Sequence, residues 1–197
     1  TPEEALLSRL TLRSMKQAKY STLNSGHFGL AAKYYTHFTS PIRRYPDLQI
    51  HRIIKDDLRG RLDKGGRIGK YSSILQHVAE QSSAMEQRAA EAEREAVKLK
   101  KAEYMLEHVG EEYDGVISGV TGWGFYVELP NTVEGLVHIM TLKDDYYNFD
   151  EENYRLVGEQ HGRVFRLGEP VRVRVRNAEP ANRTIDFTYV EKETETE

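Results

Sequence analysis

The stretch VGEEYDGVISGVTGWGFYVELPNTVEGLVHIM, residues 109–140, decides the fold of the second half of the chain. Its short runs alternate apolar with polar residues, are rich in β-branched and aromatic side chains, and are separated by turn residues, which is typical of strands. The pattern returns in VRVRVRN, residues 171–177, where valines and arginines are predicted to face opposite ways. Roughly 80 residues of such strands indicate a small closed β-barrel, with 144–162 as a longer insertion.

The residues before this stretch carry helical patterns instead. Residues 73–107 are predicted to form one long helix, because Ser73 and Gln76 fit a capping box and one narrow apolar stripe follows. A stripe this short and alanine-rich favours packing on its own domain over an intermolecular coiled coil. The stripe consists of Val78, Met85, Ala89, Ala92, Ala96 and Leu99. The first stretch, up to about residue 33, is expected to mix helix with loop, with the helical pattern over 3–20.

A shorter helix is predicted to end near Gly60, and two starts are possible for it. Ser40 followed by Pro41 has the residue types of an N-cap and a first helical position. Pro46 favours a later start, with SPIRR as a tight turn before the helix, because proline inside a helix removes a hydrogen bond. One apolar face of this helix is expected to contain Ile50, Ile53, Ile54 and Leu58.

Charge is divided unevenly along the 197 residues, whose formal net charge is -3. Residues 1–107 hold 19 Lys and Arg against 13 Asp and Glu, a net +6, whereas residues 108–197 hold 9 against 18, a net -9. Such a division suggests two units with different surfaces. The absence of cysteine excludes disulfides and thiolate metal sites. No apolar run is long enough to span a bilayer, so we expect a cytoplasmic protein without membrane partners.

The densest cluster of chemically useful residues is HFTSPIRRYPDLQIHR, residues 37–52. If Ser40 caps a helix, its first turn presents unpaired N–H groups and a positive dipole end, where Arg43 and Arg44 are unfavourable. A bound anion would remove this conflict, and phosphate matches a guanidinium group. An equally weighted alternative is a structural i,i+4 pair between Arg43 and Asp47. Asp47 and His51 are also four residues apart, for which a surface or core pair is favoured over a catalytic one.

Three segments resemble the RNB catalytic domain of the RNase II/RNase R exoribonucleases. They are GHFGLA at 26–31, YTHFTSPIRRYPDLQIHR at 35–52 and SAMEQRAAEAEREA at 83–96, and their wording is closer to RNase R than to RNase II. The resemblance implies processive degradation of RNA from its 3′ end to nucleoside 5′-monophosphates, with magnesium held by an acidic cluster. It implies that Arg43 contacts the scissile phosphate as the catalytic cation and that Arg44 binds RNA.

The chain departs from this family in its aspartates. The family's magnesium cluster has the form D-x-D-D, whereas the only adjacent aspartates here are Asp56-Asp57 and Asp144-Asp145. We therefore expect a C-terminal portion of the enzyme that binds the 3′ end of single-stranded RNA without holding magnesium or cleaving RNA. The incomplete RNB domain is expected to allow self-association.

Residues 109–140 resemble the S-one domain, a five-stranded OB-fold that binds RNA. The matching positions are Trp123, Gly124, Phe125 and Tyr126, followed by Gly-Leu-Val-His-Ile at 135–139. The resemblance implies RNA contacts by Trp123, Tyr126, His138 and Arg183, the last on a later strand. Glu179 stands where the family often has an aspartate.

Strand alternation supports exposed rings in this segment. It cannot bury both Trp123 and Tyr126 unless Gly124 bends the strand, so Phe125 is the residue predicted to fill the barrel. Exposed rings suit base stacking. The arginines of 171–177 could form a local RNA patch, although a solvated face is favoured. They are Arg172, Arg174 and Arg176.

These observations predict an α+β protein with three parts. Residues 1–107 are expected to be the mostly helical C-terminal part of an RNB domain, 108–191 an S-one barrel, and 192–197 an acidic tail. The main alternative is a noncatalytic RNA-binding protein that retains an RNB remnant. In a third interpretation, the barrel docks a protein partner.

Overall fold

The structure, a computed structural model, describes residues 8, 11–12, 14–15 and 17–191. Half of the residues 3–20 lie outside the described ones; of the others, Ser8, Thr11, Leu12 and Ser14 are helical and 17–20 are not. The tail 192–197 also lies outside the described residues. The chain divides into two compact units, Lys16–Glu93 and Arg94–Glu197 with Thr1–Met15. The long helix α3, Arg67–Leu106, contributes to both. No described helix combines the length and the apolar character needed to cross a bilayer.

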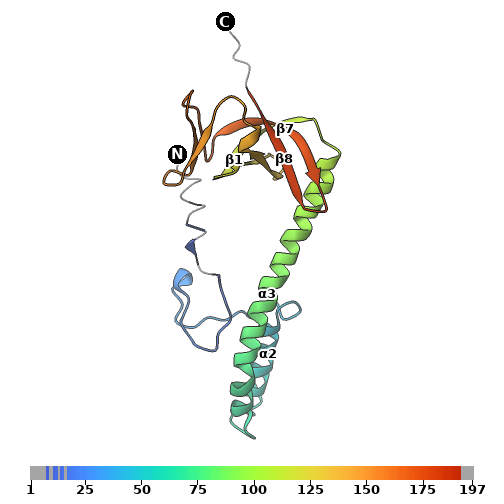
Figure 1. Cartoon of the computed structure of the whole chain (residues 1–197). Coiled ribbons are helices and arrows are strands. Elements are labelled where there is room, and N and C mark those ends of the chain that lie inside the picture. The colour runs from blue at the N-terminus through green and yellow to red at the C-terminus, as the bar shows by residue number, and fades with distance from the viewer. Residues whose placement is uncertain (1–7, 9–10, 13, 16, 192–197) are drawn as a thin grey trace. The chain divides into compact units, whose positions relative to one another are not determined.

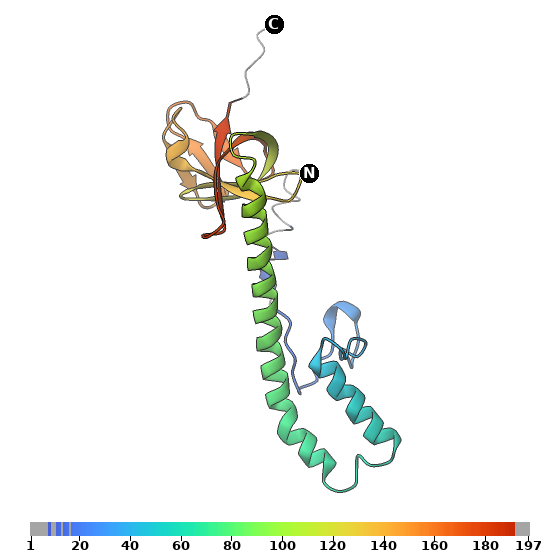
Figure 2. The same ribbon diagram turned by 90° about the vertical axis from the view of Figure 1, so that its right-hand side faces the viewer.

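The first unit is a helical hairpin preceded by loops. The hairpin consists of α2, Tyr45–Leu58, and the first part of α3, joined by a short glycine-containing loop (Figure 2). The loops contain the short 3-10 helix η1, Phe28–Leu30. Pro46 lies in the first turn of α2, where its missing N–H would have had no partner. The start near Pro46 is therefore confirmed, and the start at Pro41 is wrong.

The apolar face predicted for α2 is only partly covered. Ile54 and Leu58 are 39% and 81% exposed, whereas the side chains that α2 buries are the polar ones of Asp47, Gln49 and Asp56. This helix is thus held by buried hydrogen bonds and ion pairs more than by an apolar stripe.

Helix α3 differs from its prediction at its start and along its middle. It begins at Arg67, and the Ser73 hydroxyl donates to the Lys70 carbonyl at 2.8 Å, so the capping box is wrong. Residues 84–94 are all exposed, so the predicted stripe does not pack on its own domain there. Further along, Ala102 and Met105 are fully buried against the barrel.

The second unit is built on a closed barrel of five strands in the order β1-β2-β3-β8-β7 (Figure 1). Strand β3 pairs with β8 in parallel, and the other neighbours are antiparallel. The α+β class with a five-stranded OB-like barrel is therefore confirmed. The barrel strands are β1 (Glu112–Thr121), β2 (Gly124–Glu128), β3 (Glu134–His138), β7 (Pro170–Glu179) and β8 (Thr184–Val190).

Alternation along the strands fills the barrel as the sequence predicts. Phe125 is fully buried, and the valines of β7 point inward while its arginines point outward. The insertion carries a three-stranded sheet of its own, made by β4 (Tyr147–Asp150), β5 (Arg155–Gly158) and β6 (Val164–Arg166). Phe165 of β6 stacks on Phe125 with ring centroids 4.6 Å apart, which joins the insertion to the core.

Candidate nucleic-acid interface

Residues 40–44 form a tight turn immediately before α2. The backbone N–H groups of Arg43 and Arg44 donate to the Ser40 carbonyl at 3.3 and 3.0 Å. Arg44 is the N-cap residue of α2, in an extended conformation, and no side chain caps the helix. Two arginines therefore lie just before the positive end of the helix dipole, whereas a helix start at Ser40 would have placed them inside the first helical turn.

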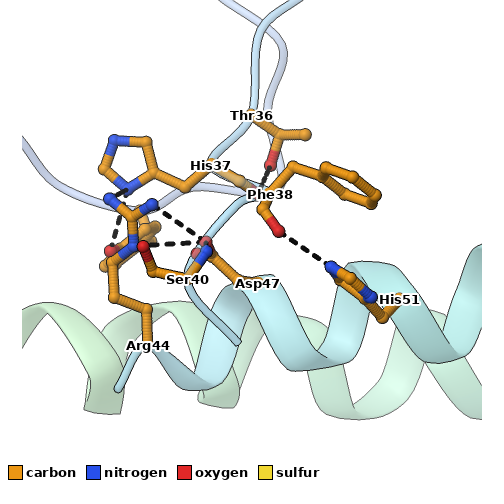
Figure 3. Close-up of polar contacts among 8 residues, drawn as sticks. Thr36, His37, Phe38, Ser40, Arg44, Asp47 and His51 are labelled. Atoms are coloured by element: carbon orange, nitrogen blue, oxygen red, sulfur yellow. Dashed lines mark hydrogen bonds and ion pairs between the residues drawn. The ribbon is translucent and has the colours of Figure 1, made fainter. Parts of the chain in front are cut away.

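Asp47 anchors this turn from inside the first turn of α2 (Figure 3). Its fully buried Oδ2 accepts from the Ser40 N–H at 2.8 Å and from Arg44 Nε and Nη2 at 3.2 and 2.9 Å. Burial alone would raise the pKa of this carboxyl, but the Ser40 amide and the Arg44 guanidinium together lower it below its ordinary value. The carboxylate thus stays charged and fixes both the turn and Arg44.

A second set of contacts holds Arg44 from its other side. Arg44 Nη1 lies 3.1 Å from Nδ1 of His37, which is also 3.1 Å from the Tyr20 hydroxyl. Burial, followed by a hydrogen bond to Glu86, raises the pKa of Tyr20 to about 12. Tyr20 is therefore a neutral hydroxyl at physiological pH.

Arg43 is left free by this arrangement. Its side chain is exposed and has no hydrogen bond or ion pair with another described residue. The alternative in which Arg43 pairs with Asp47 is wrong, because Arg44 takes that carboxylate. One arginine of the motif is thus available for a ligand, while the other is engaged with protein groups.

His51 does not pair with Asp47. Its Nε2 lies 2.8 Å from the Phe38 carbonyl, and its ring stacks on that of Phe38 with centroids 4.3 Å apart (Figure 3). The structural interpretation of this histidine is therefore the one that the contacts favour. It ties the loop before the turn to α2.

The second group of predicted residues lies on the barrel around the β1–β2 turn. Gly124 has φ 145°, and a Cβ placed there would lie 2.1 Å from the Val137 carbonyl oxygen. Only glycine permits this approach. The bend leaves Trp123 in the turn, 55% exposed, and Tyr126 on the outer face of β2, half-buried, while Phe125 points inward.

His138 comes to the same edge from β3. It pairs with Gly124 across the sheet, and the N–H of the following Ile139 donates to the Trp123 carbonyl at 2.9 Å. Its Nδ1 accepts from the Met140 amide at 3.2 Å, which holds the imidazole by one nitrogen. Three of the predicted RNA contacts, those of Trp123, Tyr126 and His138, are thus on neighbouring strands and their connecting turn.

The same outer face contains residues that the sequence analysis did not select. Leu136 lies opposite Tyr126 on β3, and Asp186 lies opposite Leu136 on β8; both are half-buried. The signal that could have found them is the period of two, because each alternates with a buried neighbour.

Arg183 is in the β7–β8 turn rather than on a strand, which corrects its predicted position. It has φ 57°, and its guanidinium donates to Glu95 of α3 at 2.8 Å. Glu179 is the last residue of β7 and pairs with Thr184, the first of β8. An RNA contact by Arg183 would therefore compete with Glu95.

The arginines of β7 form a largely neutralised face. Arg172 and Arg174 both donate to Glu112 of β1, at 2.9 and 2.6 Å, and Arg172 is also 3.6 Å from Asp114. The hydrogen bonds from Arg174 and Arg172 lower the pKa of Glu112. This pairing favours the solvated face over a local RNA patch.

Within the part of the chain that the structure describes, no three His, Asp or Glu side chains come together as a metal site would require. The described residues therefore offer no carboxylate cluster of the kind that holds a magnesium ion.

Comparison with known proteins covers nearly the whole chain. Residues 1–60 match the model of the RNB domain, and residues 107–189 match that of the S1 RNA binding domain, the S-one domain named above. The chain is 52% identical over 192 residues to Ribonuclease R 1 of Lactococcus lactis, covering 98% of this chain and 23% of that protein. It is 50% identical over 193 residues to Ribonuclease R of Aquifex aeolicus, covering 97% and 27%.

A solved structure agrees with both sequence matches. RNase R of Mycoplasma genitalium, in complex with ribose-methylated single-stranded RNA, superposes with a TM-score of 0.86 at 27% identity, covering 96% of this chain and 30% of that one. The chain thus spans about a quarter of the length of the curated relatives it matches. Two family models and whole-chain identity near one half agree, and we conclude that the chain belongs to the ribonuclease R family, as a C-terminal portion in which an RNB segment is followed by an S1 domain.

Proposed function

We propose that this chain supplies an RNA-binding barrel and a phosphate-binding arginine to a 3′–5′ exoribonuclease of the RNase R type. Such an enzyme degrades single-stranded RNA processively and releases nucleoside 5′-monophosphates. Membership of the ribonuclease R family supports the proposal. The single observation that carries it is the free guanidinium of Arg43 in a turn that buried groups hold fixed.

The proposed role of Arg43 follows from its surroundings. Hydrolysis of a phosphodiester develops negative charge on the phosphate oxygens, and a guanidinium stabilises that charge best when it is already in place. Asp47 and Ser40 fix the turn, and the start of α2 adds a positive dipole end to the same location. Arg44 pairs with Asp47 and so helps to hold the turn that carries Arg43 in place. Its positive charge also adds a weaker electrostatic attraction to RNA.

The barrel is proposed to hold the RNA strand by stacking. Trp123 and Tyr126 present rings at one edge of the barrel, with His138 beside them. Base stacking on such rings contributes roughly 1–3 kcal/mol per base and tolerates any sequence. The structure of the Mycoplasma genitalium relative with single-stranded RNA supports this substrate class.

We further propose that the carboxylates for magnesium belong to a part of the enzyme outside this chain. The described residues offer no cluster of that kind. The chain alone is then expected to bind the 3′ end of single-stranded RNA without releasing mononucleotides.

The test compares this chain with a longer RNase R that contains it, using 5′-labelled single-stranded RNA and magnesium. We expect the chain to bind without cleavage and the longer protein to degrade RNA. In the longer protein, Arg43→Ala should lower turnover by about 10² to 10³ and RNA affinity only slightly. Arg43→Lys keeps the positive charge but loses the bidentate guanidinium donors. Its turnover should lie between that of the unaltered protein and that of Arg43→Ala.

Two results would contradict the proposal. Release of mononucleotides by nuclease-free preparations of this chain would show that it holds a complete catalytic site. Equal losses of affinity and turnover in Arg43→Ala would make Arg43 a substrate-positioning residue with no part in stabilising the reacting phosphate.

A further inference from the structure

The connection between α2 and α3 concentrates positive charge. Residues 52–70, which we call the basic hairpin, contain seven Lys and Arg against three Asp, a net +4 in a chain whose net charge is -3. The segment comprises the end of α2, a loop, and the first turn of α3 (Figure 2).

Asp56 fixes the backbone of the basic hairpin. Its Oδ2 accepts from the Tyr71 hydroxyl at 2.9 Å and from Arg67 Nη1 at 2.6 Å, so it joins the last turn of α2 to the first turns of α3. The Arg61 N–H donates to the Asp56 carbonyl at 2.8 Å. The hydrogen bond from Tyr71, together with Arg67, lowers the pKa of the Asp56 carboxyl. The loop is therefore anchored at both of its ends.

The other cations of the basic hairpin are available. Each is exposed, and none forms an ion pair or a side-chain hydrogen bond with another described residue. They are Arg52, Lys55, Arg59, Arg61, Lys64 and Lys70. Outside the basic hairpin some cations are paired, as Lys100 is with Glu103 and Arg155 with Asp150, whereas Arg43 and Arg176 are exposed without a side-chain hydrogen bond or ion pair to another described residue.

The barrel does not supply this kind of charge. Residues 108–197 carry 9 Lys and Arg against 18 Asp and Glu, and Arg172 and Arg174 are paired with Glu112. Stacking rings bind bases, whereas most of the electrostatic affinity for nucleic acids comes from free cations at phosphates. The two features are complementary parts of RNA binding.

We infer that the basic hairpin is a second RNA-binding surface, which contacts the phosphate backbone without reading bases. The inference rests on the proposed RNA-binding function. Its partner is the single strand that the barrel binds, because a set of exposed, unpaired cations suits closely spaced phosphates.

The test measures the salt dependence of binding of this chain to an oligouridylate of about 30 nucleotides, longer than one OB-fold site. The variant is Arg59→Gln with Lys64→Gln, both exposed positions where folding should be retained. Removing two phosphate contacts should reduce the slope of log K against log salt by about 1.4 and the affinity at 50 mM salt by roughly tenfold. The same loss is expected with single-stranded DNA, because phosphates are shared.

The matched control neutralises one Lys and one Arg that are already paired, Lys100→Gln with Arg155→Gln. It should leave the slope nearly unchanged. A third variant, Trp123→Ala, should lower affinity without changing the slope.

The outcomes separate the two proposals. An unchanged slope in the hairpin variant, with weakened binding by Trp123→Ala, would overturn the hairpin inference and leave the barrel proposal standing. An equal loss of slope in the control would also overturn it, because net charge alone would then explain the effect. Absence of RNA binding by the unaltered chain would remove both.

Discussion

At the scale of single residues, Gly124 determines which rings reach the solvent. Its φ of 145° and its approach to the Val137 carbonyl let the chain turn sharply between β1 and β2. As a result Trp123 and Tyr126 both lie outside the barrel although they are separated by an odd number of positions. The exposure of both rings therefore depends on a residue that contributes no side chain.

Gly124→Ala should destabilise the protein by about 2–4 kcal/mol, because the new Cβ meets backbone and φ is unfavourable for alanine. Urea unfolding monitored by circular dichroism measures the change. Gly122→Ala in the same turn is the control: nothing lies within 4 Å of its Cβ position, so a change within about 0.5 kcal/mol is expected. Similar stabilities of the two variants would refute a special role for Gly124.

Asp47 sets a pH dependence at the turn formed by residues 40–44. Its pKa in the folded protein is below the ordinary 3.8, so its stabilising contribution is complete above 3.8 and is lost as pH falls through the lower folded value. Asp47→Asn should cost roughly 1–3 kcal/mol at pH 7, and the difference from the unaltered chain should shrink in acid. Hydrogen exchange of the α2 amides against pH measures this, with the exposed Asp57→Asn as control. A difference that stays constant down to strong acid would contradict the assignment.

At the scale of elements, the sequence predicted the barrel better than the helices. A period of two is specific over short strands, and the inward valines of β7 and Phe125 follow it directly. The start of α2 was left open because Ser40 and Pro46 carry competing helix-start signals. Which arginine pairs with Asp47 depends on the extended conformation of Arg44, which spacing alone cannot indicate.

The exposed middle of α3 has a measurable consequence. Residues 84–94 are all exposed, so backbone hydrogen bonds, local helix propensity and surface polar contacts, such as that of Glu86 with Tyr20, hold this segment without apolar burial. Their amides should exchange at least tenfold faster than those of 102–106, where Ala102 and Met105 pack in the barrel core. Exchange mass spectrometry at low protein concentration tests this. Slow exchange that appears only at high concentration would support the self-association expected from the sequence.

At the scale of the whole molecule, the apolar core belongs almost entirely to one unit. Every residue of the main buried cluster lies between Ala102 and Phe187, whereas the buried ones among the described residues of the hairpin unit are Ala79 and three polar residues of α2. Apolar burial is the main source of stability, so the hairpin unit should be much weaker than the barrel.

Heating should therefore produce two transitions. Helical ellipticity from α2 and the first part of α3 should be lost first, and near-ultraviolet signals from the Phe125 and Phe165 cluster should follow at a temperature higher by on the order of 10 °C. Samples free of nucleic acid are needed, because bound RNA would stabilise whichever unit binds it. A single transition common to both signals would show that the units unfold together.

The barrel is closed between β3 and β8 by a short strand pairing. The parallel contact of β3 with β8 consists of two residue pairs, Leu136 with Asp186 and Val137 with Phe187, whereas β7 and β8 pair along seven. If the barrel opens locally, β3 and β8 should separate first, and the ring of Phe187 would move away from Gly135. A polynucleotide bound across the outer ends of β3 and β8 would hold these two strands together and oppose the opening of the barrel.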